Sequence, residues 1–195
     1  PVAVAVADNA VLTTSTDQAF ESLGGNGTVS LADARLTLGA GGASSTFGGS
    51  LTGGTFGGLT KLGSGSFTLA GSATYGGETR VTAGALVLPS TERLADGGRL
   101  VVGTNGTLTL AAAETVGQAD ITGRVDGAGT LNAPLTVLDG GTVAANLGGG
   151  TLRVDNGGRL DGQSAAAQVD VVVGTLVLGS GGRFSAAPAL SIGTG

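Results

Sequence analysis

The sequence predicts an all-β solenoid, a rod in which the chain winds in coils that stack strand on strand. Two observations favour this fold. Short segments that alternate apolar and polar residues, bounded by Gly, Asn or Asp, run through most of the 195 residues, as expected of strands and turns. One pattern at 150–160 returns at 174–184, so that Leu176 takes the place of Leu152. A fixed period of this size is typical of repeat architectures.

The composition indicates a chain that folds. It has 40 Gly and only 12% charged residues, against an average of about 7% Gly and about 25% charged residues. Disorder is nevertheless excluded, because Leu, Ile, Val and Phe make up roughly a quarter of the chain, above the floor of ~20%. The mean hydropathy of +0.35 points the same way.

Charge and missing residue types exclude several functions. A net charge of −5, with Lys61 as the single Lys, argues against nucleic acid as a partner. No apolar run approaches the ~18 residues of a membrane helix. The absence of Cys and His removes disulfides, the commonest general base and the commonest transition-metal ligand. We expect no enzyme activity, no catalytic or metal site and no cofactor.

The spacing of five leucines predicts how the coils stack. Successive members are separated by nearly constant intervals of roughly 22 residues, which a sandwich of antiparallel hairpins does not explain. We expect about nine coils of roughly 22 residues, separated by one strand spacing of ~4.8 Å. The predicted interior ladder is Leu86, Leu108, Leu131, Leu152 and Leu176, and the predicted second ladder is Leu94, Leu100, Leu160 and Phe184.

The coils need tight corners, and glycines are placed to form them. We expect positive φ at Gly97-Gly98, Asn105-Gly106, 156–158 and Gly181-Gly182, where Gly and Asn are tolerated best. Residues 39–58 break the spacing and predict an irregular coil or a loop.

The chain is expected to be a single unit, 1–195, cut from a longer rod. No linker composition divides it, and nothing resembles the polar cap that a solenoid end requires. The opening at 1–7 has no starting Met and no basic lead-in, which favours a start within a longer chain.

Residues 58–88 read GLTKLGSGSFTLAGSATYGGETRVTAGALVL. This segment resembles the passenger-associated repeat of bacterial autotransporters, whose pattern is approximately GLTKxGxGTLxLxGxNTYxGxTxVxAGTLxL. It departs from that pattern at Phe67, at Ala73 and at the tip formed by 76–78. A looser resemblance covers 20–38, and beyond Leu88 the chain is similar in style only.

The resemblance implies a right-handed parallel β-helix that leaves a Gram-negative cell by type V secretion. The outer-membrane barrel of the same polypeptide would be its partner during secretion. The passenger would then be displayed on the cell surface or released outside the cell, without inserting into the membrane itself. Its further partner would be an unknown surface receptor or a second copy.

Several motifs could be read as catalytic or metal-binding sites, but in each case a purely structural interpretation is favoured. Asp155 with Asp161, flanked by Arg153 and Arg159, or Asp120 with Asp126 near Arg124, would suit acid–base catalysis. Asp beside Gly at a corner is ordinary turn chemistry, and Arg–Asp pairs on a surface are common. The string 157–162 lacks the third Gly of a calcium nonapeptide.

Binding motifs are equally weak. Asn26 and Asn105 each begin Asn-Gly-Thr, which reads as a tight turn more readily than as a glycosylation site. A sugar-binding face would need stacked aromatic residues, but Tyr75 is the single Tyr and Phe67 and Phe184 fall at ladder positions. The Thr-x-Thr pattern at Thr107 does not recur coil after coil.

The sequence therefore predicts a non-catalytic β-helical stalk of an autotransporter passenger, for adhesion, self-association or display. The alternatives are a segment of a polysaccharide-active β-helix enzyme and a subunit of a self-assembling extracellular fibre. If the ladder is as predicted, Leu152→Ala or Leu176→Ala costs on the order of 2–5 kcal/mol, whereas Arg153→Ala is nearly silent.

Overall fold

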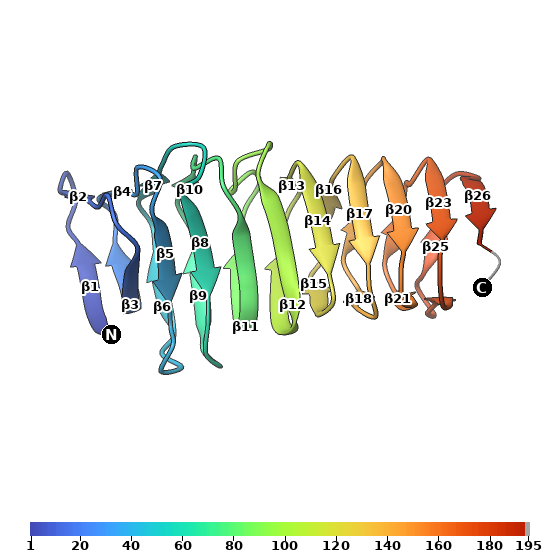
Figure 1. Cartoon of the computed structure of the whole chain (residues 1–195), viewed down its shortest axis with the longest axis horizontal. Helices are drawn as coiled ribbons and strands as arrows, with labels where there is room; N and C mark the ends of the chain where they lie inside the picture. The colour runs from blue at the N-terminus through green and yellow to red at the C-terminus, as the bar shows by residue number, and fades with distance from the viewer. Residues whose placement is uncertain (194–195) are drawn as a thin grey trace.

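The computed structural model describes residues 1–193 and shows a straight rod in which coils stack along one axis (Figure 1). This described part contains 26 strands and no helix. Every strand pairing is parallel, and the chain makes about 10 turns. The predicted parallel β-solenoid is confirmed.

Each coil has three sides, named here in chain order. The first side consists of β1 (Val2–Val6), β3 (Gln18–Gly25), β5 (Arg35–Leu38), β8 (Gly58–Lys61), β11 (Thr79–Leu88), β12 (Arg99–Leu110), β14 (Gln118–Ile121), β17 (Leu135–Leu138), β20 (Thr151–Val154), β23 (Gln168–Val171) and β26 (Ala189–Ile192). The second side consists of β6 (Ser45–Phe47), β9 (Ser66–Leu69), β15 (Arg124–Asp126), β18 (Thr142–Val143), β21 (Gly158–Leu160) and β24 (Leu176–Leu178). The third side consists of β2 (Val11–Thr13), β4 (Thr28–Ser30), β7 (Ser50–Thr52), β10 (Ser72–Ala73), β13 (Glu114–Thr115), β16 (Thr130–Asn132), β19 (Asn146–Leu147), β22 (Gln163–Ser164) and β25 (Arg183–Phe184).

Long strands join the first two sides into one sheet. β11 and β12 bend around the corner, so that their first halves pair on the first side and their second halves on the second side. The result is a 17-stranded sheet. The third side forms separate sheets of four and five strands, interrupted between β10 and β13.

The stacking register differs from the predicted ladders. Leu86 faces Leu108, as expected. Leu131 instead lies on the third side, and Leu152 on the first side. The real ladder on the second side continues from Leu108 through Val125, Val143, Leu160 and Leu178, and each of its steps is shorter than the predicted one.

The predicted second ladder is also wrong. Leu100 lies on the first side, Leu160 on the second and Phe184 on the third. All three sides share the same short alternation of apolar and polar residues, so a comparison of the sequence with itself matches one side to another. The return of the 150–160 pattern at 174–184 is such a match. Leu152 stacks on Val169 of the next coil, whereas Leu176 lies further along that coil, on its second side.

Coil length changes along the rod. Ser50 and Ser72 stack in register in the first half and are 22 residues apart. In the second half, Asn146 and Gln163 are bonded from one coil to the next and are only 17 residues apart. The coils average about 19 residues, somewhat fewer than the roughly 22 that the leucine spacing predicted. Residues 39–58 hold β6 and β7, which pair with β9 and β10 in the walls of the rod.

Some of the predicted corner glycines are needed for space rather than for positive φ. Among those predicted to have positive φ, only Gly157 does, at 80°. A Cβ on Gly106 would lie 2.1 Å from the carbonyl oxygen of Val81 in the coil below, and a Cβ on Gly182 would lie 2.0 Å from that of Leu160. Adjacent coils thus approach too closely at these corners for any side chain.

Side chains that point inward form one continuous apolar core. Leu36, Leu59, Leu100 and Leu108 are all fully buried. Few polar side chains share this interior, and the largest of them is Lys61. Because each coil packs mainly on its neighbours, stability is distributed along the rod.

The register predicts that Leu152→Ala and Leu176→Ala lower the free energy of unfolding by different amounts, although the sequence pattern predicted the same loss for both. Leu152 is 1% exposed, whereas Leu176 is only partly buried, in the last full coil. Leu152→Ala should cost about 2–5 kcal/mol of unfolding free energy, and Leu176→Ala clearly less. Urea unfolding measures both, with the exposed Arg153→Ala as the control within about 0.5 kcal/mol. Equal losses at Leu152 and Leu176 would contradict this register.

Candidate functional site

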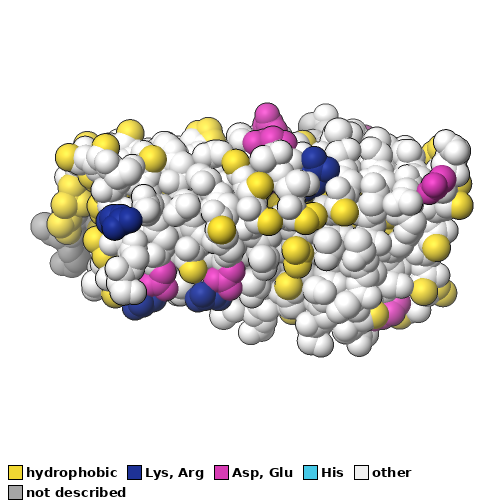
Figure 2. Space-filling view, turned by 180° about the vertical axis from the view of Figure 1, so that it is seen from behind, with side chains coloured by type: hydrophobic (Ala, Val, Ile, Leu, Met, Phe, Trp, Pro, Cys, Tyr) yellow, Lys and Arg dark blue, Asp and Glu magenta, His cyan; other side chains and the backbone are white. Residues whose placement is uncertain are grey.

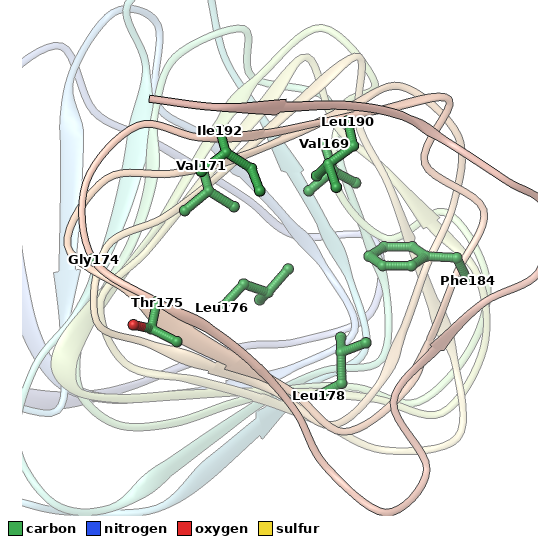
Figure 3. A pocket seen from close by; sticks show the side chains of 9 residues that line it. All are labelled: Val169, Val171, Gly174, Thr175, Leu176, Leu178, Phe184, Leu190 and Ile192. Carbon is green, nitrogen blue, oxygen red and sulfur yellow. The ribbon is translucent and has the colours of Figure 1, made fainter. Parts of the chain in front are cut away.

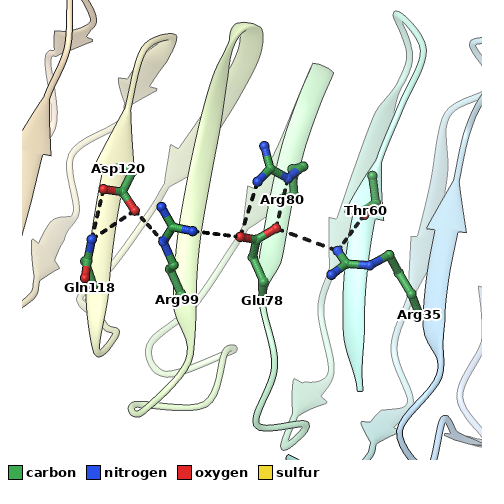
Figure 4. A network of polar contacts seen from close by, with 7 residues as sticks. All are labelled: Arg35, Thr60, Glu78, Arg80, Arg99, Gln118 and Asp120. Atoms are coloured by element: carbon green, nitrogen blue, oxygen red, sulfur yellow. Dashed lines mark hydrogen bonds and ion pairs between the residues drawn. The ribbon is translucent and has the colours of Figure 1, made fainter. Parts of the chain in front are cut away.

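A row of charged side chains crosses the first side of the rod (Figure 4). At its centre, the Glu78 carboxylate accepts a hydrogen bond from Arg80 Nε at 2.9 Å and one from Arg99 Nη1 at 3.3 Å. Arg35 Nη1 lies 3.7 Å from the same carboxylate. Arg99 Nε also donates to Asp120 at 2.6 Å.

This row carries three arginines and two carboxylates, so both carboxylates are neutralised within it. Each carboxylate is held by at least one guanidinium, and the arginines stay partly exposed to water. Exposed ion pairs of this kind contribute about 0–1 kcal/mol each. The row spans five coils, because Arg35 on β5 reaches Glu78 across β8 and bonds to Thr60 there at 3.1 Å. The carboxylates of Glu78 and Asp120 are both bound to arginines.

The carboxylates considered for acid–base chemistry lie on different sides. Asp120 belongs to β14 on the first side and Asp126 to β15 on the second. Asp155 follows β20 on the first side and Asp161 follows β21 on the second. The structure does not join either pair into one site.

Three of these aspartates are bound by the Arg two residues earlier. Arg124, Arg153 and Arg159 donate through Nε to the following Asp at 2.6, 2.6 and 3.0 Å. Residues two apart on a strand share a face, so the pairing is local. The Arg-x-Asp pattern is therefore a surface ion pair of one strand.

The remaining motifs also have structural roles. Arg159 in the calcium-like string 157–162 binds Asp161, and within residues 1–193 no three His, Cys, Asp or Glu side chains are grouped as metal ligands. Asn26 donates to Asp8 at 3.0 Å, and Asn105 lies inside β12. Tyr75 is buried, and its hydroxyl group is 2.7 Å from Thr79 Oγ1.

Lys61 is a site that the sequence reasoning missed. Its register partners are Leu38 and Val81, so it occupies an inward position, and it is 1% exposed. Nζ donates to the carbonyl oxygens of Leu62, Gly63 (3.0 Å) and Ala83 (3.4 Å) at the next corner. Burial lowers the pKa of Lys61, and the charge of Glu21 opposes that effect.

The signal for this burial was present in the sequence. Lys61 is two residues after Leu59 and therefore in phase with the inward positions of β8. The ammonium group pairs with the carbonyl groups of Leu62 and Gly63, which lie between β8 and β9, and with that of Ala83, where the register of β11 shifts. Its role is to close a corner of the coil.

Rows of hydroxyl groups on the third side were also missed. Thr28, Ser50 and Ser72 stack in register, and Ser30 stacks on Thr52. Ser50 Oγ and Ser72 Oγ are 3.1 Å apart. The pattern Gly-[Ser/Thr]-apolar-[Ser/Thr] recurs once per coil along these strands, and this half of the rod carries few charges when seen from behind (Figure 2).

An apolar hollow of about 320 Å³ lies at the last coils (Figure 3). Val169, Leu178 and Phe184 point into it. These residues continue the inward rows of the core. The hollow is therefore the uncovered end of the stacked interior.

Residues 59–88 match the family model described as passenger-associated-transport-repeat. The chain carries this repeat. The match and the β-solenoid together fit an autotransporter passenger domain, so the predicted resemblance is confirmed. No curated protein and no solved structure matches the chain.

The passenger-associated-transport-repeat has a defined place in the rod. It begins in β8, completes one coil through β9 and β10, and ends with β11 on the second side of the next coil. Its Lys61 therefore closes a corner against Ala83 of the same repeat. The repeat implies exposure at the cell surface or outside the cell. In residues 1–193, the structure has no helix that is long and apolar enough to cross a membrane.

Substitution at Lys61 tests the corner role. Lys61→Met keeps the length of the side chain but removes the donor to three carbonyl groups, which should cost about 1–3 kcal/mol of unfolding free energy. Arg80→Met, on the exposed face of the same repeat, is the matched control and should change stability by about 0–1 kcal/mol. Chemical denaturation measures both. A Lys61→Met variant as stable as the control would refute the assignment.

Proposed function

We propose that the chain is a non-catalytic, β-helical stalk segment of an autotransporter passenger, displayed at or released from a Gram-negative cell surface. Its uses would be adhesion to a surface receptor, self-association or display. The observation that carries the proposal is the passenger-associated-transport-repeat, which lies in register inside a continuous β-solenoid. The outer-membrane barrel of the same polypeptide would be its partner during secretion.

The mechanism is mechanical. Each coil is paired by parallel backbone hydrogen bonds to the coil before it, and its inward side chains extend the same core. A chain that emerges end first could therefore fold one coil at a time on the coil already formed. Burial of each new apolar layer would supply a driving force outside the cell.

Surface display measures this function directly. The chain would be fused behind an N-terminal epitope and ahead of a heterologous outer-membrane barrel, and the epitope would be detected on intact cells. We expect display with the original chain and with Thr109→Asp, which changes an outward position. Leu108→Asp places a charge in the core and should strongly reduce the displayed signal. Equal display by the two variants would count against folding-driven export.

A self-assembling fibre is the second candidate, because parallel strand edges of a solenoid can pair between copies. In the described residues, Val2 and Val11 of the first coil are each 65% exposed, and Leu190 and Ile192 of the last coil are 63% and 69% exposed. Sedimentation distinguishes the stalk from the fibre, since a stalk stays monomeric whereas a fibre forms a series of oligomers whose size grows with concentration.

An enzyme segment that acts on polysaccharides would need two free carboxyl groups about 5–9.5 Å apart. The aspartates considered for this role are bound to arginines or lie on different sides. A reducing-sugar assay tests the activity, and we expect no release.

A further inference from the structure

The third side of the rod is interrupted at residues 89–98, which carry no strand between β10 and β13 (Figure 1). The backbone still makes a few bonds to the neighbouring coils. Ala73 N, in the preceding coil, donates to Arg93 O at 2.6 Å. Towards the following coil, Glu92 N donates to Ala113 O at 3.2 Å, and Gly98 O accepts from Gly117 N at 2.8 Å. Side chains add further contacts across this junction.

Glu114 provides the central contact. It occupies the inward position in register with Leu131 and is fully buried. Its carboxylate accepts the backbone N–H groups of Arg93 at 2.8 Å and Leu94 at 2.7 Å. A side chain thus replaces the backbone acceptors that a strand would have offered.

Two further side chains bind the junction on its outer face. The Glu92 carboxylate accepts the backbone N–H of Thr115 at 3.1 Å and the Thr115 hydroxyl at 2.9 Å. Arg93 Nη1 donates to the carbonyl oxygens of Ala70 and Gly71 at 3.0 and 3.2 Å. Glu92 also has a φ of +48°, a conformation that costs a non-glycine residue about 1–3 kcal/mol.

The surroundings of Glu114 make its ionisation unfavourable. Burial raises the pKa of Glu114 to about 7, and the negative charge of Glu92 adds to this, while the two backbone N–H groups and Arg93 oppose it. Tyr75, two coils before Glu114, is neutral and bonded to Thr79. Leu131, from the coil above, carries no charge.

This pKa shift determines how stability changes with pH. Because the folded state holds the Glu114 proton more tightly than the unfolded chain, stability is full below the ordinary pKa of 4.5 and falls as pH rises towards 7. Ionisation places a charge in the core, which the two backbone N–H groups and Arg93 stabilise only in part, beside a segment that carries no strand. Opening of residues 89–98 exposes the carboxylate to water and removes that cost.

We propose that residues 89–98 form a proton-linked seam in the rod, which opens locally when Glu114 loses its proton while the neighbouring coils stay closed. This inference does not depend on the proposed stalk function. The trigger is the exposure of the chain to neutral or alkaline surroundings. At neutral or alkaline pH, the seam would expose the interior of the rod to water on its third side.

Native-state hydrogen exchange of the intact chain tests the seam. The amides of Arg93 and Leu94 are followed at pH 5.5 and pH 8, and their rates are corrected for intrinsic exchange. A pKa that moves from 4.5 to about 7 predicts an increase in the opening equilibrium of about 25-fold over this range. The amides of Leu131 and Leu147, on β16 and β19 of the same side, serve as internal references and should change far less.

Variants assign the effect to one carboxyl group. Glu114→Gln keeps the shape and cannot ionise, so the pH dependence at Arg93 and Leu94 should disappear. Glu92→Gln, at the exposed neighbouring carboxylate, should retain most of it. If Glu114→Gln fails to fold, the original chain and Glu92→Gln still decide the question. The proposal would be overturned if the corrected exchange rates of Arg93 and Leu94 changed between pH 5.5 and pH 8 no more than those of the reference amides.

Discussion

The whole structure depends on the return of each coil onto the one before it. That return places inward aliphatic side chains on top of one another and lets the three sides pair in parallel, apart from the interruption of the third side at 89–98. Parallel pairing needs a crossover rather than a hairpin, and the two other sides of the coil are that crossover. Coil length can therefore change along the rod without breaking the ladder, because the turns at the corners contain the extra residues of the longer coils.

Two buried polar residues provide hydrogen-bond partners for backbone groups at positions where strand pairing is irregular or absent. Lys61 brings donors to the carbonyl groups of a corner, and Glu114 brings acceptors to the N–H groups of a coil that lacks a strand. Both sit at inward positions that aliphatic residues fill in neighbouring coils. Buried backbone groups must be paired, and here an ionisable side chain does it at the expense of desolvation.

The strand class, the winding and the repeat at 59–88 could be predicted from local patterns alone. The register could not, because Leu108, Leu131 and Leu152 sit in nearly identical local sequences on three different sides. Only contacts between distant residues distinguish those sides. The buried roles of Lys61 and Glu114 were likewise hidden, since charge suggested exposure. Period-two phasing with Leu59 was the one available signal for Lys61.

Cysteine pairs offer the most direct measurement of the coil register, because the natural chain has no Cys. Thr109 and Asp126 are register partners on the second side, and adjacent strands about 4.8 Å apart lie within reach of a disulfide. Thr109→Cys with Asp126→Cys should therefore crosslink under mild oxidation. Thr109→Cys with Asn132→Cys, the pair that a stacking of Leu108 on Leu131 would align, should not. Crosslinking of the second pair in place of the first would contradict the stacked-coil register on which the account rests.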